Sequence, residues 1–549
     1  MKPTNSHDIS RSAAMFSGIL AGAVAIAIGE LVGSFSSTWQ SPVVGVATGI
    51  IDRVPRSVKD FGVEKFGTND KLALVVGILF ASVIFAAVLG VIARRRPLVS
   101  IGGFAAFAVV GIWGSQQPVG ATPGAIIPSL AAGAGGIATL WLMLRVAPPR
   151  SMVVTVTKST TETDADTVQV PVVGDEPQGI PEPVAAGSMF DSAGSRRKFL
   201  FSSAGVAVIA AAAATGGRAL RTRFSAASSR RNVSLPRPAA PLAAAPAGVT
   251  SNVVGVSNFY TSNADFYRID TAVEVPQILV DNWELRIHGM VDKEIRITFD
   301  ELLKRKMVEQ DITLTCVSNT VGGSLTGTAR WLGVPLKDLL DEAGVDPRAD
   351  QLVGRSVDGW TSGFPIATLD GRPALLAIGM NGEPLPLEHG FPARVIVSGI
   401  YGYVSATKWI TELEVTTFDA FDAYWVKRGW DKLAPIKTQS RIDTPRTLAK
   451  VAPGTVNIGG VAWAQTVGIS KVEVQIDDGP FGAATLADEL NANTWRLWSM
   501  AWEGATPGRH RITVRATDAN GIVQSEERAD PFPNGASGWM SILVEVKAG

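Results

Sequence analysis

The sequence MNGEPLPLEHGFPAR (residues 380–394) and, earlier in the chain, TLTCVSNTVGG (residues 313–323) carry the pattern that decides the fold. The first stretch places His389 and Arg394 five residues apart, which by itself fits either an ordinary turn or a binding loop. The second is an apolar, β-prone run that ends in glycines, so Cys316 falls where a strand meets a loop. A ligand can reach a side chain there, although free cysteines are most often buried and inert.

Cys316 is the single cysteine among 549 residues. One cysteine permits no intrachain disulfide and no zinc or iron–sulfur site built from several cysteines. The thiol is therefore either an inert core group or a residue that acts alone. The chain also has 50 basic and 50 acidic residues, and this zero net charge gives no electrostatic support for nucleic-acid binding.

The sequence around these stretches predicts two folded domains. Residues 250–440 mix alternating strands, such as Trp283–Ile287, with helical spacing at Val334–Ala343, which is typical of an α+β domain. Residues 441–549 contain short alternating runs, Asp-Gly and Asn-Gly turns and tryptophan-rich segments. That second pattern predicts an all-β sandwich.

Four stretches, taken in order, resemble the sulfite oxidase family of molybdopterin oxidoreductases. They are TLTCVSNTVGG (313–323), ARWLGVPLKDLL (329–340), MNGEPLPLEHGFPAR (380–394) and YGYVSATKW (401–409). The C-terminal sandwich likewise resembles the immunoglobulin-like dimerisation domain of that family. The resemblance does not extend to the N-terminal half of the chain.

This resemblance implies one molybdenum held by a pyranopterin dithiolene and by the thiolate of Cys316. A soft thiolate suits a metal that is already bound through sulfur. The cofactor ends in a phosphate, so its binding needs cationic side chains and backbone donors. The pterin contacts of the family fall on Asn263, Tyr267, Arg268, Asp358, His389, Arg394, Ser405, Ala406, Thr407 and Lys408.

Two departures from the family concern the substrate. Sulfite oxidases carry CAGNRR at the molybdenum cysteine, and the arginine five residues after it helps bind sulfite; here Val321 takes that place. Trp360 lies where the family has a tyrosine in the substrate pocket, and an indole offers no hydroxyl to an oxyanion. Sulfite, a sulfoxide and another small oxo compound all remain candidate substrates, with Arg330 and Arg355 as weaker candidate anion contacts.

The N-terminal part predicts a membrane region. Hydrophobic residues make up 46% of the chain and charged residues 18%, below the roughly 25% charged residues of soluble domains. Runs at 13–33, 72–93, 98–115 and 124–144 are each long enough to cross a hydrocarbon core of about 30 Å. Residues 1–150 therefore predict a four-helix transmembrane region. Its N-terminus is expected in the cytoplasm because Arg94–Arg96 and Arg145 flank the second and fourth runs.

The connection between the two halves has three predicted parts. Residues 151–194 are polar and acidic and predict a cytoplasmic linker. Residues 195–220 begin with SRRKFL, which resembles a twin-arginine export signal, and continue as a fifth apolar run; a plain fifth transmembrane helix is the alternative. Residues 221–249 are rich in Pro and Ala and predict an extended, exposed tether. Under either alternative the chain after residue 220 lies outside the cytoplasmic membrane.

We expect electrons to pass between the predicted molybdenum and a separate molecule. None of the four histidines falls in an apolar run, so no bis-histidine haem is expected. A separate electron-transfer protein or a quinone would then exchange electrons with the molybdenum. Glu30 is the one acidic residue in the runs, and it is either functional or snorkels to the nearby interface.

The sequence therefore predicts a multi-pass, membrane-anchored molybdenum–molybdopterin enzyme. It would perform two-electron oxygen-atom transfer on the outer face of the cytoplasmic membrane, and the resemblance implies a homodimer through the C-terminal domain. One alternative is a non-enzymatic envelope protein that keeps the fold for binding or assembly. A transporter or sensor centred on the bundle has little support, because the runs contain few polar residues.

Overall fold

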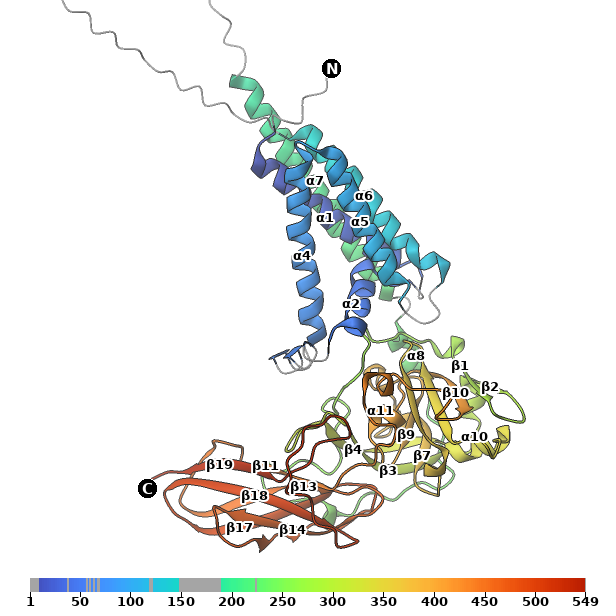
Figure 1. The fold of residues 1–549 in the computed structure, drawn as a ribbon, viewed down its shortest axis with the longest axis vertical. Coiled ribbons are helices and arrows are strands. Elements are labelled where there is room, and N and C mark those ends of the chain that lie inside the picture. Colours follow the sequence, from blue (N-terminus) through green and yellow to red (C-terminus); the bar gives the residue numbers. More distant parts are fainter. Residues whose placement is uncertain are drawn as a thin grey trace, which may run out of the picture. The chain divides into compact units, whose positions relative to one another are not determined.

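A computed structural model describes residues 9–36, 39–55, 58, 61–62, 65–66, 70–117, 122–147, 189–222 and 225–548 (Figure 1). The chain divides into two compact units. The first covers residues 1–117 and 121–222, and the second covers residues 223–549 together with residues 118–120. Within the described residues, the first unit consists of helices and the second holds every sheet.

The first unit contains five helices that are long and apolar enough to cross a membrane, counted over the described residues. Each of the four predicted runs forms a helix, because almost no charged residue interrupts its apolar surface. The expectation of a helical N-terminal region is confirmed. The helices are α1 (Arg11–Gly33), α4 (Asp70–Ala93), α5 (Pro97–Ser115), α6 (Ile127–Val146) and α7 (Met189–Arg221).

Two features of this unit differ from the expectation. A further short helix, α2 (Pro42–Arg53), follows α1, and its 12 residues are too few to cross a bilayer. Helix α7 begins at Met189, so the SRRKFL string lies inside the helix rather than before it. Of the predicted linker 151–194, residues 151–188 lie outside the described residues.

Small residues let α1 and α4 approach closely. Gly18 of α1 and Gly90 of α4 face each other, and a Cβ added to either would meet a backbone atom of the other helix. Ala21 and Ala86 are buried near the same crossing. Close backbone approach through small residues is the usual way in which membrane helices gain van der Waals contact.

Most of the segment expected to be an extended tether belongs to the second unit, and it contains a short helix, α8 (Ala226–Asn232), so it is not extended throughout. The Ala239 N–H donates to the Met307 carbonyl oxygen at 2.8 Å, and Arg330 Nη2 donates to the Ala243 carbonyl oxygen at 2.8 Å. Val249 is 1% exposed. Many residues of the segment are exposed, but these bonds attach it to the domain, because extended backbone offers donors and acceptors that a neighbouring surface can satisfy.

Two sheets form the α+β part of the second unit. One has the order β2-β1-β10-β5-β6, and the other has the order β3-β4-β7-β8 with β9 beside β7. Strands β1 and β10 are parallel, and the other pairs are antiparallel. The strands are β1 (Glu284–Gly289), β2 (Ile295–Thr298), β3 (Val308–Thr315), β4 (Thr326–Pro335), β5 (Gln351–Ser356), β6 (Thr361–Pro365), β7 (Ala374–Met380), β8 (Glu383–Pro384), β9 (Arg394–Val397) and β10 (Ile410–Thr416).

A large apolar core fixes the end of β3. Every residue of β7 is buried, and β4 pairs with β3 in a register that places Thr326 opposite Thr315. Helices α9 (Phe299–Leu303) and α10 (Leu336–Ala343) pack buried leucines into the core. The residue after β3 is Cys316, so the core determines where its side chain begins.

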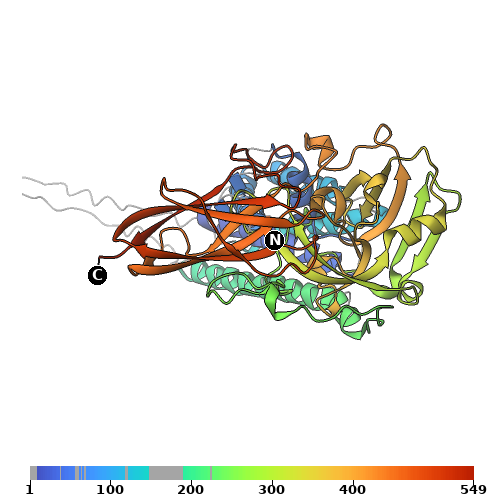
Figure 2. The same cartoon turned by 90° about the horizontal axis from the view of Figure 1, so that it is seen from below.

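The last part of the second unit is a sandwich of two further sheets (Figure 2). Buried residues from both sheets, among them Ile458, Val472 and Val514, form one core. This confirms a C-terminal part rich in β-sheet. The first sheet has the order β11-β13-β17-β16, and the second has the order β12-β19-β18-β14-β15. Their strands are β11 (Gln439–Thr444), β12 (Lys450–Val451), β13 (Gly454–Trp463), β14 (Ile469–Ile476), β15 (Gly482–Ala483), β16 (Thr485–Leu486), β17 (Arg496–Ala505), β18 (Gly508–Asp518) and β19 (Met540–Val546).

Candidate active site

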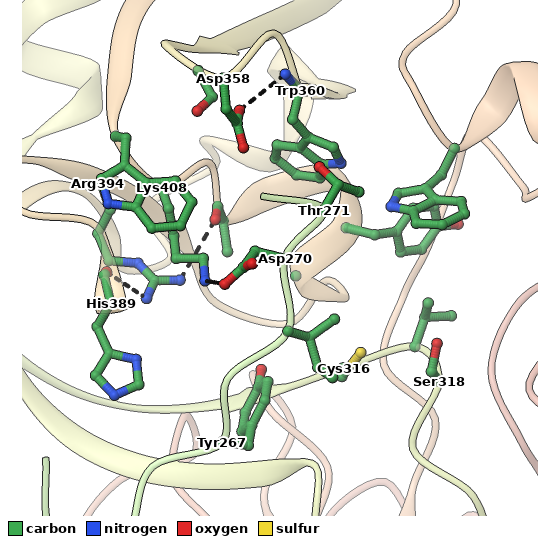
Figure 3. A pocket seen from close by; sticks show the side chains of 18 of the residues that line it. Tyr267, Asp270, Thr271, Cys316, Ser318, Asp358, Trp360, His389, Arg394 and Lys408 are labelled. Atoms are coloured by element: carbon green, nitrogen blue, oxygen red, sulfur yellow. Dashed lines mark hydrogen bonds and ion pairs between the residues drawn. The ribbon is translucent and has the colours of Figure 1, made fainter. Parts of the chain in front are cut away.

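A cavity of about 130 Å³ lies in the second unit (Figure 3). Segments far apart in the sequence supply its walls: residues 266–271, 316–318, 356–360, 389–394, 402–409 and 425–430. Basic side chains form one part of the lining and aromatic side chains another. Cys316 also lines the cavity, so one pocket brings the thiol together with both groups.

The Cys316 sulfur faces this cavity (Figure 3). The Cys316 N–H donates to the Leu325 carbonyl oxygen at 2.9 Å, and the Leu325 N–H donates to Asn319 Oδ1 at 2.8 Å. The loop after β3 is therefore closed by its own hydrogen bonds. Burial raises the pKa of the Cys316 thiol, so the thiol keeps its proton at neutral pH unless a metal ion takes its place.

Three basic side chains, His389, Arg394 and Lys408, lie together on one side of the cavity (Figure 3). Arg394 opens β9, and the Val395 N–H donates to the Thr407 carbonyl oxygen at 2.9 Å, which brings Lys408 alongside. Arg394 Nη1 donates to the His389 carbonyl oxygen at 3.0 Å. The five-residue spacing seen in the sequence thus places both side chains at one wall.

Burial disfavours positive charge on all three groups. It lowers the pKa of Lys408 to about 8 and that of Arg394 to about 10. Burial, followed by the charge of Arg394, lowers the pKa of His389 to about 4. His389 Nε2 lies 3.1 Å from the Asn263 carbonyl oxygen, which can only accept, so Nε2 carries the proton. An anionic ligand in this part of the cavity would favour the charged forms of Lys408 and Arg394.

Two carboxyl groups also line the cavity. The Asp270 side chain is 4% exposed and pairs with Lys408 Nζ at 2.7 Å and with Arg268 Nε at 2.8 Å. Asp358 Oδ1 accepts the Trp360 N–H at 3.1 Å, and burial raises the pKa of Asp358. Sequence reasoning missed Asp270, because nothing in its local sequence links it to a lysine that lies far away in the chain.

Besides Phe266, Tyr267 and Trp409, the aromatic lining includes Trp360, Tyr403, Trp425 and Trp430, which we call the aromatic wall. The ring centroids of Tyr403 and Trp430 are 5.7 Å apart, and those of Trp425 and Trp430 are 6.3 Å apart. Sequence reasoning named Trp360 alone. Two tryptophans five residues apart, just after the last strand of the α+β part, were a visible signal, but no local pattern joins them to Cys316.

The cavity brings together most of the predicted site residues. Those that line it are Tyr267, Cys316, Asp358, Trp360, His389, Arg394, Ala406 and Lys408. They come from five separate segments, and the shared wall agrees with the order of the motifs in the sequence. Their roles toward a cofactor stay a prediction.

Four predicted contacts do not line this cavity. Asn263 lines a separate groove beside Arg230, and Arg268 reaches the cavity only through its ion pair with Asp270. The remaining two are buried side chains with partners of their own: Ser405 Oγ donates to the Tyr401 carbonyl oxygen at 3.1 Å, and Thr407 Oγ1 lies 2.6 Å from Ser362 Oγ.

The two other arginines considered for anion binding also lie elsewhere. Arg330 Nε pairs with Asp311 at 2.9 Å, and Arg355 pairs with Glu414. Neither arginine lines the cavity. Among the residues that the structure describes, Arg394 and Lys408 are thus the lysine and arginine side chains at its wall.

Comparisons with known proteins agree with this geometry. The family model described as "Oxidoreductase molybdopterin binding domain" matches residues 272–425. Mitochondrial sulfite oxidase of Rattus norvegicus is 29% identical over 342 residues, covering 53% of this chain and 62% of that protein. The uncharacterized oxidoreductase YuiH of Bacillus subtilis (strain 168) is 30% identical over 152 residues, covering 27% of this chain and 72% of that protein. The chain belongs to the sulfite oxidase-like family of molybdopterin-binding oxidoreductases.

The similarity does not cover the full length of these relatives. The chain spans about three-fifths of the length of the rat sulfite oxidase that it matches. Among solved structures, the sulfane dehydrogenase SoxCD from Paracoccus pantotrophus aligns with a TM-score of 0.47 and 21% identity, covering 54% of this chain and 85% of that chain.

The cavity of this family member fits the cofactor for which the family is named. Arg394 Nε is buried and has no hydrogen-bond partner among the described residues, as expected if a bound group supplies an acceptor. No cluster of three or more His, Cys, Asp or Glu residues in the described part of the chain could hold a metal ion. A metal beside Cys316 would thus depend mainly on ligands that the cofactor brings, as a dithiolene does.

Proposed function

We propose that the protein is a membrane-anchored molybdenum–molybdopterin oxidoreductase that performs two-electron oxygen-atom transfer. The observation that carries this proposal is the position of Cys316, whose sulfur faces a cavity lined by basic and by aromatic side chains. A charged cofactor and an organic substrate need these two environments, and a reactive metal must touch both. The fold of the family provides one cavity in which they meet.

The residues of the basic side would hold the cofactor. Cys316 would bind molybdenum as a thiolate, since coordination removes the thiol proton that burial alone retains. Arg394 and Lys408 would bind the phosphate, with Lys408 already oriented by Asp270. His389, Tyr267 and the backbone of 405–407 would supply hydrogen bonds. When bound, the group supplies the two-electron redox chemistry.

The aromatic side would bind the substrate. Arg394 and Lys408 are assigned to the cofactor, and Val321 stands where sulfite oxidases have their anion-binding arginine. An uncharged organic oxide, such as a sulfoxide, therefore fits this wall better than sulfite does. Reduction of a sulfoxide consumes two electrons and two protons and yields a sulfide and one water. Oxidation of sulfite would take its oxygen from water and release two protons and two electrons.

The N-terminal unit would anchor the enzyme in the cytoplasmic membrane. Within the described part of the chain, five helices have sufficient length and apolar surface, and the basic residues between α4 and α5 favour a cytoplasmic position for that turn. The catalytic unit would then lie on the outer face, with SRRKFL as the address for export after the cofactor is inserted. A separate protein or a quinone would exchange electrons, and the sandwich would serve as an immunoglobulin-like dimerisation domain.

Elemental and pterin analysis of the detergent-purified protein tests this proposal. We expect nearly one molybdenum and one pterin per wild-type chain, and loss of molybdenum together with turnover in Cys316→Ala. The matched control is Ser324→Ala, an exposed position in the same loop, which should retain both. Turnover of methyl phenyl sulfoxide with reduced benzyl viologen, and of sulfite with ferricyanide, measures the two directions. Wild-type molybdenum content and turnover in Cys316→Ala would refute the assignment.

A further inference from the structure

The aromatic wall of the cavity is in contact with the C-terminal sandwich. The connection between β18 and β19, residues 519–539, carries Phe532 to the ring of Trp430, at a centroid distance of 5.4 Å and an interplanar angle of 83°. This edge-to-face arrangement is the preferred geometry for aromatic pairs. Trp430 lines the cavity and Phe532 does not, so Phe532 stands behind the wall.

Hydrogen bonds hold the two segments in register beside this pair. The Asp431 N–H donates to the Pro533 carbonyl oxygen at 3.2 Å, and Asn534 Nδ2 donates to Asp431 Oδ2 at 3.0 Å. On its other side, the Asp431 carbonyl oxygen accepts the Tyr403 hydroxyl at 2.6 Å. Asp431 thus joins the sandwich to two residues of the wall, since Trp430 is its chain neighbour.

The connection from the sandwich is itself well anchored. Lys437 Nζ donates to Asn534 Oδ1 at 2.9 Å and to the Gly535 carbonyl oxygen at 2.6 Å. Gly535 has a φ of 95°, and a Cβ there would collide with the Tyr401 side chain. Gln439 Nε2 donates to the Ala536 carbonyl oxygen at 3.0 Å. These hydrogen bonds fix the position of the connection, so the connection can hold the neighbouring Trp430 in place.

The segment that bears the tryptophans lies outside the strands and contains one short helical turn. Residues 425–430 form a short 3-10 turn, η9 (Val426–Arg428), ending at Gly429 with a φ of 89°. The Trp430 N–H donates to the Trp425 carbonyl oxygen at 3.2 Å, and the two ring centroids are 6.3 Å apart, so the two residues lie close together. No strand or long helix includes them, so contacts with neighbouring segments help to define the wall.

We propose that Phe532 and Asn534 are positioning residues that set the Trp425–Trp430 wall, so that the sandwich determines which organic substrates the cavity accepts. This inference rests on the proposed function, because it takes the cavity as the substrate site. It gives the C-terminal domain a role within one chain, apart from dimerisation.

Substitutions of Phe532 test the proposal through the Michaelis constant. We expect Phe532→Ala to raise KM for methyl phenyl sulfoxide about tenfold with kcat within twofold, because the wall binds the phenyl group equally before and during reaction. The smaller dimethyl sulfoxide should show a weaker effect. Phe532→Tyr keeps the ring and should behave as wild type. Ile522→Ala, an exposed apolar residue of the same connection at 63% exposure, is the matched control.

A readout independent of turnover separates this inference from the proposed function. In protein labelled with 5-fluorotryptophan, the ¹⁹F resonance lost in Trp430→Phe belongs to Trp430. We expect Phe532→Ala to shift or broaden that resonance, and Ile522→Ala to leave it unchanged. If Phe532→Ala does not fold, Asn534→Ala provides the same test through Asp431. An unchanged resonance, or an unchanged KM in an active enzyme, would overturn the inference. A wild type without molybdenum would instead refute the proposed function and leave the resonance test in force.

Discussion

At the scale of single residues, His389 shows how burial sets a protonation state. His389 is 4% exposed, and burial together with the nearby charge of Arg394 lowers its pKa to about 4. The imidazole is therefore neutral at pH 7 and offers Nε2–H to the Asn263 carbonyl oxygen. Because Nε2–H is used by Asn263 and Nδ1 of the neutral ring can only accept, the phosphate charge is left to Arg394 and Lys408.

The lowered pKa of His389 predicts the direction in which stability changes with pH, and an acid titration can check it. Between pH 6.5 and about 4 the unfolded chain binds a proton at His389 that the folded chain does not, so stability falls as pH is lowered. From pH 7 to pH 5 the loss is about 2 kcal/mol. We expect His389→Gln to unfold with a smaller decrease in Tm over this interval, measured by circular dichroism in detergent.

His510 provides a control of opposite sign. The hydrogen bond to Asp477 raises the pKa of His510, so its contribution is present at low pH and is lost as pH rises through the folded pKa. His510→Gln should therefore show an acid loss at least as large as that of wild type. An equal decrease in Tm on acidification for His389→Gln and wild type would contradict a neutral His389 in the folded protein.

At the scale of elements, the crossing of α1 and α4 depends on having no side chain at two positions. Gly18 and Gly90 meet backbone to backbone, and an added Cβ must displace a helix rather than a flexible side chain. Gly77 lies on the same α4 with no atom within 4 Å of an added Cβ. Helix α4 therefore contains one glycine that has no space for a side chain, Gly90, and one that has space, Gly77.

We expect Gly90→Ala to lower the stability of the helical unit by about 1–3 kcal/mol, because overpacking forces the helices apart. Gly77→Ala should be neutral or stabilising, since Ala has the higher helix propensity by about 1 kcal/mol. Thermal unfolding of the two variants in the same detergent makes the comparison. Equal stability of the two variants would show that the helices do not pack at Gly90.

At the scale of the whole molecule, the proposed topology places one chain on two sides of a membrane. The turn between α4 and α5 carries Arg95 and Arg96, which are exposed and favour the cytoplasm. The second unit has its own apolar cores and folds around the cavity. Export of such a unit is consistent with a signal for folded proteins.

Labelling of single cysteines tests this topology. In the Cys316→Ala background, Ile522→Cys should react with a membrane-impermeant maleimide added to intact spheroplasts. Arg95→Cys should react only after the membrane is permeabilised. Both positions are exposed, so access to the reagent decides the result. Labelling of Arg95→Cys in intact spheroplasts would reverse the proposed orientation.

The sequence by itself determined the elements whose cause is local. Hydropathy located α1, α4, α5 and α6, because a helix that spans lipid must satisfy its own backbone and be apolar along its length. The resemblance to the motifs of the family predicted Cys316, His389, Arg394 and Lys408 as site residues, and all four line one cavity. Helix α2 escaped prediction because its 12 residues fit neither a span nor a loop pattern.

Only the tertiary structure decided what surrounds those residues. It brought Asp270 to Lys408 and placed Trp425 and Trp430 on the cavity wall, while Ser405 and Thr407 turned to other partners. It also placed Phe532 of the sandwich behind Trp430. These contacts join residues far apart in the chain, and packing of the whole core rather than local periodicity determines which of them meet.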